Sequence, residues 1–223
     1  SRGLGDVYKR QLQHTTHMQA VGGRIETNIH RATFPTQPLR QVFVIGGLLD
    51  LEKPVVCRLN GHAAGFGASV ALLCDVIIAD ENAKIGDPHV KVGLVAGLEA
   101  VGLARKIPLE AVLRMALLGG AERMDAAEAH RLGMVGEVLP PEALMPRARE
   151  LAGLIAQHSP TALALSKQAI WKSLDMGLDA ALEQTWQSIR EHTNHPDLEE
   201  GAKAFVEKRR PRWAPYTGPE GGE

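Results

Sequence analysis

The sequence predicts an α/β core followed by a helical C-terminal region. Two apolar, β-branched runs, PVVCRLNG at 54–61 and VIIAD at 76–80, are typical of buried strands, and a glycine-rich turn and an apolar segment separate them. A strand, a helix and a second strand within this span form a crossover unit, whose two strands run parallel in one sheet. Beyond Gly102 the strand signals nearly vanish, and start and stop signals of helices dominate.

The segments around these strands complete the predicted core. Residues 12–37 show no sustained period and predict a connector, whereas LRQVFVIGGLLDLEK at 39–53 predicts a short amphipathic helix. After the glycine-rich turn, ASVALLCD at 68–75 is short and apolar, as a buried helix would be. A Gly-Asp-Pro turn at 86–88 then leads into an alternating stretch.

The C-terminal half carries paired start and stop signals of helices. EAVLRMALL at 110–118 ends at a double glycine, and Asp125 with Glu128 predicts a capping box for a helix that Gly133 ends. A brief strand, VGEVLP, follows at 135–140. Pro141 and the Ser159-Pro160 pair each open a helix, and two more are predicted at 179–192 and 198–210. We therefore divide the chain into an N-terminal segment (1–37), an α/β core (38–140) and a helical region (141–223).

Composition excludes several classes of function. Of the 223 residues, 44% are hydrophobic and 23% charged, which is typical of a soluble globular protein. The formal net charge of −1 provides no basic field for nucleic acid or an anionic membrane, and no apolar run of about 18 residues occurs. Cys57 and Cys74 lack CxxC spacing, so we expect reduced thiols and a cytoplasmic protein.

The first residues carry a separate signal. The run DVYKRQ at 6–11 is what the reading frame GAT GTG TAT AAG AGA CAG encodes, and that DNA looks like a transposon end used to prepare sequencing libraries. We interpret Ser1–Gln11 as a sequencing-adapter scar, the alternative being a natural N-terminal tail. With a scar, the natural protein would begin upstream and the chain would be an N-terminally truncated piece.

The turn Gly61–Gly67, GHAAGFG, is a candidate oxyanion site. It lies between a predicted strand and a helix start, where free backbone N–H groups point outward. Stabilising a thioester enolate requires such donors at about 3 Å from the developing oxyanion, and small residues allow a carbonyl to approach them. The same pattern also suits a purely structural turn. A dinucleotide site is disfavoured, because Val70 replaces the third glycine of GxGxxG and Asp80 follows Gly65 by only 15 residues.

Three side chains near this turn are candidates for acid–base chemistry. His89 carries an imidazole, which can act as a general acid or base, and Asp87 is positioned to hold one tautomer unless Pro88 turns the two apart. Glu99 is a lone carboxylate in an apolar segment, with an exposed helix face as the alternative. Ser69 lies where its hydroxyl would cap the helix or hold a water, and no GxSxG surrounds it. Each of these residues also has an ordinary structural interpretation.

Other polar clusters are interpreted conservatively. The pairs His14/His17 and His192/His195 lack a third ligand nearby in sequence, so no metal site is predicted. The basic cluster Lys208, Arg209, Arg210 and Arg212 suits a solvated helix end, with phosphate binding as the alternative.

Taken together, EKPVVCRLNGHAAGFGASVALLCDVIIADENAKIGDPHVKVGLVAG at 52–97 resembles the signature stretch of the enoyl-CoA hydratase/isomerase (crotonase) superfamily. The resemblance continues through LLGGAERMDAAEAHRLGMVGEVLPPEAL at 117–144 and GAKAFVEKRRPRW at 201–213. It implies a crotonase-like spiral of ββα turns with a helical trimerisation region, hence a homotrimer or hexamer. It also implies an acyl-CoA substrate in fatty acid metabolism, with coenzyme A as part of the substrate and no other cofactor.

The resemblance also implies roles for single residues. The backbone N–H of Phe66 matches one oxyanion donor, whereas nothing in Ser1–Gln37 resembles the upstream motif that supplies the other. Ser69 and His89 occupy the positions of the hydratases' two water-activating glutamates. The family's Pro-Gly-x-Gly-Gly loop falls on 96–100, which makes Glu99 a replacement acid or base. The expected substrate contacts are Ala64, Gly65, Phe66, Gly67, Pro88, Val92, Gly97 and Leu98.

The sequence thus predicts an enzyme that hydrates or isomerises an enoyl-CoA, with His89 moving the proton, helped by Ser69 or Glu99. A related CoA lyase, decarboxylase or thioesterase would share the oxyanion chemistry. The alternative from another class is an acyl-CoA-binding or oligomer-scaffold protein that has lost its acid–base residues.

Overall fold

The computed structural model describes residues 18–20, 23–24 and 51–218. The predicted helix at 39–53 lies almost wholly outside these residues, and Ser1–Gln11, His14 and His17 lie entirely outside them. Two compact units are described: 18–20, 23–24 and 55–152 form the first, and 51–54 with 153–218 form the second. The predicted helical region begins at Pro141, whereas the longer part of the second unit begins at Gly153.

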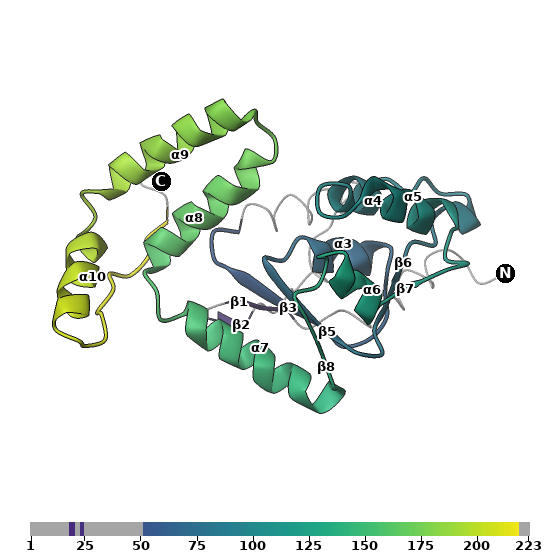
Figure 1. Ribbon diagram of the computed structural model, residues 1–223, viewed down its shortest axis with the longest axis horizontal. Coiled ribbons are helices and arrows are strands. Elements are labelled where there is room, and N and C mark those ends of the chain that lie inside the picture. The colour runs from purple at the N-terminus through teal and green to yellow at the C-terminus, as the bar shows by residue number, and fades with distance from the viewer. Residues whose placement is uncertain (1–17, 21–22, 25–50, 219–223) are drawn as a thin grey trace, which may run out of the picture. The chain divides into compact units, whose positions relative to one another are not determined.

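The first unit contains the predicted crossover. Strands β3 (Val55–Leu59) and β5 (Val76–Asp80) pair in parallel, with Val56 opposite Val76, and α3 (Phe66–Leu72) connects them. Strand β8 (Glu137–Leu139) continues the parallel sheet beyond β5, as Figure 1 shows. The β-branched residues of β3 and β5 are buried except for Val76, which is partly buried, so hydrophobic burial on both faces of the sheet explains why these two segments form strands.

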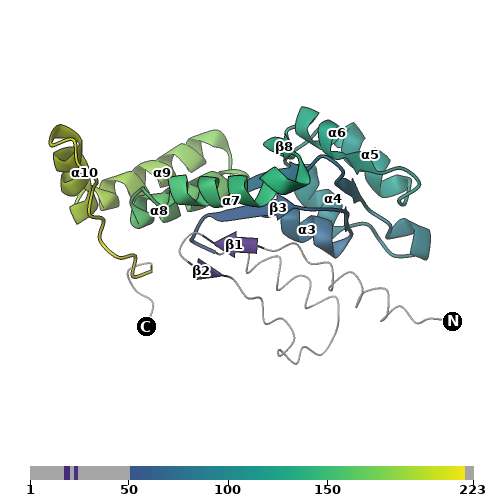
Figure 2. The same ribbon diagram turned by 90° about the horizontal axis from the view of Figure 1, so that it is seen from below.

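Two further strands lie in the segment predicted to be a connector. Strand β1 (Met18–Ala20) pairs antiparallel with β3 and with β2 (Gly23–Arg24), and Figure 2 shows β1 between these two. The order of the sheet is β2-β1-β3-β5-β8. The interpretation of 12–37 as connector alone was therefore wrong at these positions. Pairing with β3 supplies the hydrogen bonds that define these strands, and a run of two or three residues carries no detectable period of its own.

A second, small sheet positions the glycine turn. Strand β6 (Lys84–Gly86) pairs in parallel with β4 (Ala63–Ala64) and antiparallel with β7 (Met124–Asp125). None of these strands was predicted. Their register places Ala64 opposite Gly86, so the residues that follow each strand start side by side.

Helices α5 (Leu109–Leu117) and α6 (Ala126–Arg131) of the first unit follow the predicted punctuation, with a difference at one cap. Helix α4 (Leu98–Leu103) packs on α3, and α5 ends at Gly119 and Gly120, both with positive φ. Helix α6 is capped by Asp125, whose carboxylate accepts the Glu128 N–H at 2.8 Å. The carboxylate of Glu128 pairs with Arg131 instead, so the described bonds form only half of the predicted capping box.

The second unit is helical. Helix α7 (Pro141–Ile155) leads into it from the first unit, and α8 (Pro160–Ser173) and α9 (Leu178–His192) then lie side by side (Figure 1). Helix α10 (Pro196–Val206) completes it. Ser159 caps α8 as predicted: its hydroxyl accepts the Ala162 N–H at 3.1 Å and donates to Asp197 at 2.5 Å.

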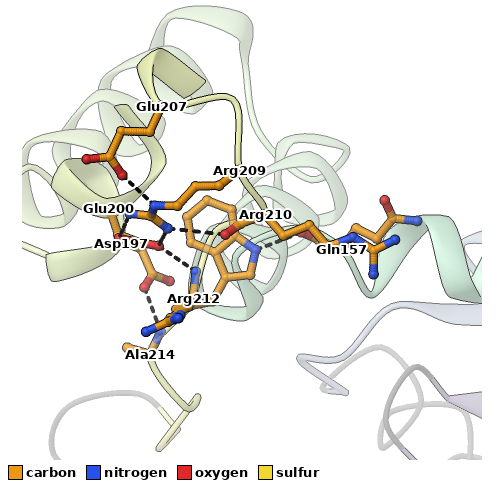
Figure 3. A network of polar contacts seen from close by, with 9 residues as sticks. Gln157, Asp197, Glu200, Glu207, Arg209, Arg210, Arg212 and Ala214 are labelled. Carbon is orange, nitrogen blue, oxygen red and sulfur yellow. Dashed lines mark hydrogen bonds and ion pairs between the residues drawn. The ribbon is translucent and has the colours of Figure 1, made fainter. Parts of the chain in front are cut away.

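Within the basic cluster at the end of α10, the Arg209 side chain lies against acidic side chains. Figure 3 shows the Arg209 guanidinium between Glu200 and Glu207, with nitrogen–oxygen distances of 2.6 and 2.5 Å in the two ion pairs. Glu200 also accepts the backbone N–H of Arg212, and Asp197 accepts that of Ala214. Arg209 therefore fastens the C-terminal segment to α10, which is a structural role.

Candidate active site

The glycine turn presents the start of α3. Gly65 adopts φ 52° and ψ −127°, a conformation available essentially to glycine alone. Its carbonyl accepts the N–H groups of Ala68 and Ser69 at 2.9 and 3.1 Å. The amides of Phe66 and Gly67 are the first in the helix, so they have no acceptor one turn earlier. A Cβ built on Gly67 would meet nothing within 4 Å, so the turn has open space beside it.

The Asp-Pro-His segment follows β6 directly. One carboxylate oxygen of Asp87, Oδ1, lies 2.6 Å from His89 Nδ1 and also accepts the His89 backbone N–H at 3.0 Å. Pro88 therefore does not turn the two side chains apart. Both are buried, with Asp87 1% and His89 8% exposed. The other carboxylate oxygen, Oδ2, has no hydrogen-bond partner within the described part of the chain.

The stretch after His89 is not extended. His89 caps a short 3₁₀ helix, η2 (Val90–Val92), which Gly93 ends with φ 77°. The prediction of an alternating stretch was therefore wrong. Backbone bonds from Val92 and Leu94 to the His89 carbonyl close this turn, and they outweigh the weak alternation of the sequence.

Ser69 lies on α3, two residues past the glycine turn. Its side chain is 3% exposed, and its Oγ has no hydrogen-bond partner among the described residues. Gly65 is the N-cap of α3 and no side chain bonds at that cap, so the interpretation of Ser69 as a capping residue was wrong. A buried hydroxyl without a hydrogen-bond partner destabilises the folded state. Such a hydroxyl is therefore a candidate to bind a ligand atom or a water molecule.

For the remaining predicted residues, the structure gives mainly the position of the backbone. Gly97 is the N-cap of α4, so Leu98 and Glu99 stand in its first turn, and α4 packs on α3. The predictions for the side chains of Phe66, Leu98 and Glu99 lie outside what the structure describes. Val92 is 58% exposed at the end of η2, and Pro88 is partly buried beside Asp87.

Two glycines that support the site were interpreted in the sequence only as a helix stop. A Cβ on Gly119 would lie 2.8 Å from Val90 Cγ2, and one on Gly120 would lie 3.7 Å from Pro88 Cβ. Both glycines also have positive φ. The double glycine therefore supports the turn that carries His89 as well as ending α5. Its spacing from His89 in the sequence, 30 residues, gives no local signal of that contact.

Nowhere in 18–20, 23–24 and 51–218 do three or more histidine, cysteine or acidic side chains gather as metal ligands would. The rings of His192 and His195 stack with centroids 4.9 Å apart, and His195 accepts the Asp197 N–H as the cap of α10. No helix in the described part of the chain is both long and apolar enough to span a membrane.

In the first unit, the pairing of β4 with β6 brings the segment that precedes α3 alongside the segment that leads to the buried Asp87–His89 pair. Comparison with known proteins specifies the family. The family model described as enoyl-CoA hydratase/isomerase matches residues 26–215, so the chain belongs to this family, which is part of the crotonase superfamily.

Relatives share the sequence across the described units. The chain is 37% identical to 2,3-dehydroadipyl-CoA hydratase of Escherichia coli, covering 74% of this chain and 64% of that protein. It is 36% identical to short-chain-enoyl-CoA hydratase of Clostridium acetobutylicum, covering 72% and 61%. The chain thus spans less than two thirds of the length of these two enzymes. An enoyl-CoA hydratase/isomerase crystal structure from Mycobacterium paratuberculosis has a TM-score of 0.72 at 38% identity, covering 75% of this chain and 66% of that one.

Proposed function

We propose that the protein binds an enoyl-CoA thioester and catalyses its hydration or double-bond isomerisation through an enolate. The observation that supports this most is the Asp87–His89 pair, whose segment follows Gly86, the partner of Ala64 in the β4–β6 pairing that precedes α3. Polarised carbonyl chemistry requires both parts, because donors stabilise the oxyanion while a base exchanges the proton.

The backbone N–H of Phe66 would donate to the thioester oxygen. Only the main chain is used, so the side chain at this position need not be polar. The open space beside Gly67 allows the thioester to approach. Negative charge that develops on the oxygen as the enolate forms would thus meet a fixed donor that requires no reorganisation.

His89 would move the proton. In isomerisation, the imidazole takes a proton from the carbon next to the carbonyl, and the imidazolium returns it two carbons further along, so the double bond shifts. In hydration, the imidazole takes a proton from water as the oxygen adds to the double bond, and a proton is returned to the enolate carbon. The partnerless hydroxyl of Ser69 would hold the water or the acyl chain.

The acyl group is left open by the proposal. Relatives carry names that specify different acyl groups, including (E)-benzylidenesuccinyl-CoA hydratase of Thauera aromatica at 35% identity over 83% of this chain. Coenzyme A as part of the substrate, a homotrimer or hexamer, and a cytoplasmic location are parts of the same proposal.

The test uses the protein expressed from its full gene, with crotonyl-CoA and a 3-enoyl-CoA in D₂O, read by mass spectrometry. We expect water addition or deuterium uptake, and a fall of at least about 100-fold in His89→Gln, in the range for loss of an acid–base group. His130→Gln is the histidine control, because His130 is an exposed histidine outside the candidate site whose ring bonds to the Val135 carbonyl.

Two results would contradict the proposal. Wild-type rates in His89→Gln would exclude His89 as the proton-transfer group. Failure to convert either substrate, together with measurable binding of coenzyme A, would instead support the acyl-CoA-binding alternative.

A further inference from the structure

We propose that Asp87 is a positioning residue that holds the imidazole of His89 in one tautomer and stabilises the imidazolium formed during turnover. The inference rests on the proposed role of His89 in proton transfer. Asp87 itself would touch neither substrate nor reacting atoms, because it would act on the far side of the ring, at Nδ1.

The hydrogen bonds assign the tautomer. Oδ1 of Asp87 accepts the backbone N–H of His89 at 3.0 Å, so this oxygen is an acceptor. The same oxygen lies 2.6 Å from Nδ1, which therefore donates and carries the ring proton. Nε2 is then the nitrogen whose lone pair takes up and returns a proton.

Burial strengthens this pairing. Asp87 is 1% exposed, and low dielectric around a hydrogen bond increases its electrostatic contribution. Oδ2 has no hydrogen-bond partner among the described residues, so the charge of the carboxylate is balanced mainly through Oδ1. A positive charge on the His89 ring would compensate the negative charge of the Asp87 carboxylate. The pairing is therefore stronger in the imidazolium intermediate than in the resting state.

The alternative is that Asp87 only closes the turn. Asp87→Asn separates the two roles, because an amide oxygen in place of Oδ1 still accepts both N–H groups but carries no charge. A turn-closing role is retained in this variant, whereas stabilisation of the imidazolium is lost.

Asp80→Asn is the matched control. Asp80 is also buried, and its Oδ1 accepts the backbone N–H of Asn82, two residues on, at 2.7 Å. Asp80 and Asp87 therefore each accept a backbone N–H from the residue two positions on. After Asp80 that residue is Asn82, not a histidine.

We expect Asp87→Asn to lower kcat about 10- to 100-fold, the difference between a charge-assisted and a neutral hydrogen bond, with KM within about twofold. Asp80→Asn should keep both constants within about twofold. Nitrogen-15 NMR of the histidine-labelled full protein, with His89→Gln for assignment, should show Nδ1–H in the wild type.

The outcomes are distinguishable. Wild-type kcat in Asp87→Asn, or an Nε2–H tautomer in the wild-type protein, would overturn the inference. An Nδ1–H tautomer that is lost in Asp87→Ala, in a protein that converts no enoyl-CoA, would support the pairing and overturn the proposed function instead.

Discussion

Gly65 donates its backbone N–H to the carbonyl oxygen of Gly86 at 3.3 Å. Gly65 precedes the first amides of α3, and Gly86 precedes the Asp-Pro-His segment. This bond extends the parallel pairing of β4 and β6 by one step, so main-chain hydrogen bonds hold the residue before α3 next to the residue before the Asp-Pro-His segment. The side chains of the site then need only local contacts to be oriented.

Gly65→Ala should reduce both stability and turnover. A side chain at φ 52° and ψ −127° costs about 1–3 kcal/mol, and relaxing that strain would displace the amides of α3. Urea unfolding and turnover of the enoyl-CoA substrate measure the two effects. Gly67→Ala is the stability control, because its Cβ meets nothing within 4 Å. Equal unfolding free energies for the two variants would contradict the assigned strain.

Ser69→Ala should separate function from stability. Because its hydroxyl has no partner among the described residues, its removal should change the unfolding free energy by less than about 0.5 kcal/mol while lowering turnover. Ser159→Ala is the opposite case, since that hydroxyl bonds Asp197 and caps α8. We expect it to cost about 2 kcal/mol in thermal or urea unfolding. A larger loss of stability in Ser69→Ala than in Ser159→Ala would refute both assignments.

Docking of the C-terminal segment should weaken in acid. Hydrogen bonds from Arg209 and from the Arg212 backbone lower the pKa of Glu200 to about 2 from its ordinary value of 4.5. A folded-state pKa below the unfolded value gives stability that is present above pH 4.5 and is lost as pH falls towards 2. The protection factors of the Arg212 and Ala214 amides, which are exchange rates corrected for the pH dependence of intrinsic exchange, should therefore fall over that range. In Glu200→Gln the protection factors should already be low and should show less of this pH dependence.

The two cysteines should be unreactive in the native protein. Cys57 and Cys74 are free and buried. A hydrogen bond with Cys57, followed by burial, raises the pKa of the Cys74 thiol above its ordinary value. Since the thiolate is the reactive form, a disulfide reagent such as DTNB should modify both thiols only after denaturation. Rapid reaction of one thiol in the native protein would contradict this environment.

Local sequence signals predicted the elements that form from their own residues. The apolar β-branched runs of β3 and β5 and the Ser159-Pro160 start of α8 were recognisable because each carries its pattern within a few residues. Strands β4, β6 and β7 were missed, since two or three residues become a strand only through pairing with distant ones.

The candidate site shows the same limit. Gly65, Ser69 and His89 were predicted as candidates from residue type and position. Whether the side chains of Asp87 and His89 point toward each other on either side of Pro88 could not be predicted in this way. The support that Gly119 and Gly120 give to residues 88–91 depends on how α5 ends against that turn. Such contacts are set by tertiary packing, which a single sequence does not encode locally.

The segment Leu51–Pro54 belongs to the second unit, although it directly precedes β3 of the first. Lys167 donates to the Lys53 carbonyl at 3.0 Å, across 114 residues, and Gln168 bonds Glu52. The second unit therefore completes its native contacts only when the chain closes a long loop. Closing this loop has an entropic cost, which precedes any stabilisation from the contacts of Lys167 and Gln168. On the ribosome, residues 51–54 emerge well before α8, so their contacts with Lys167 and Gln168 form among the last steps of folding.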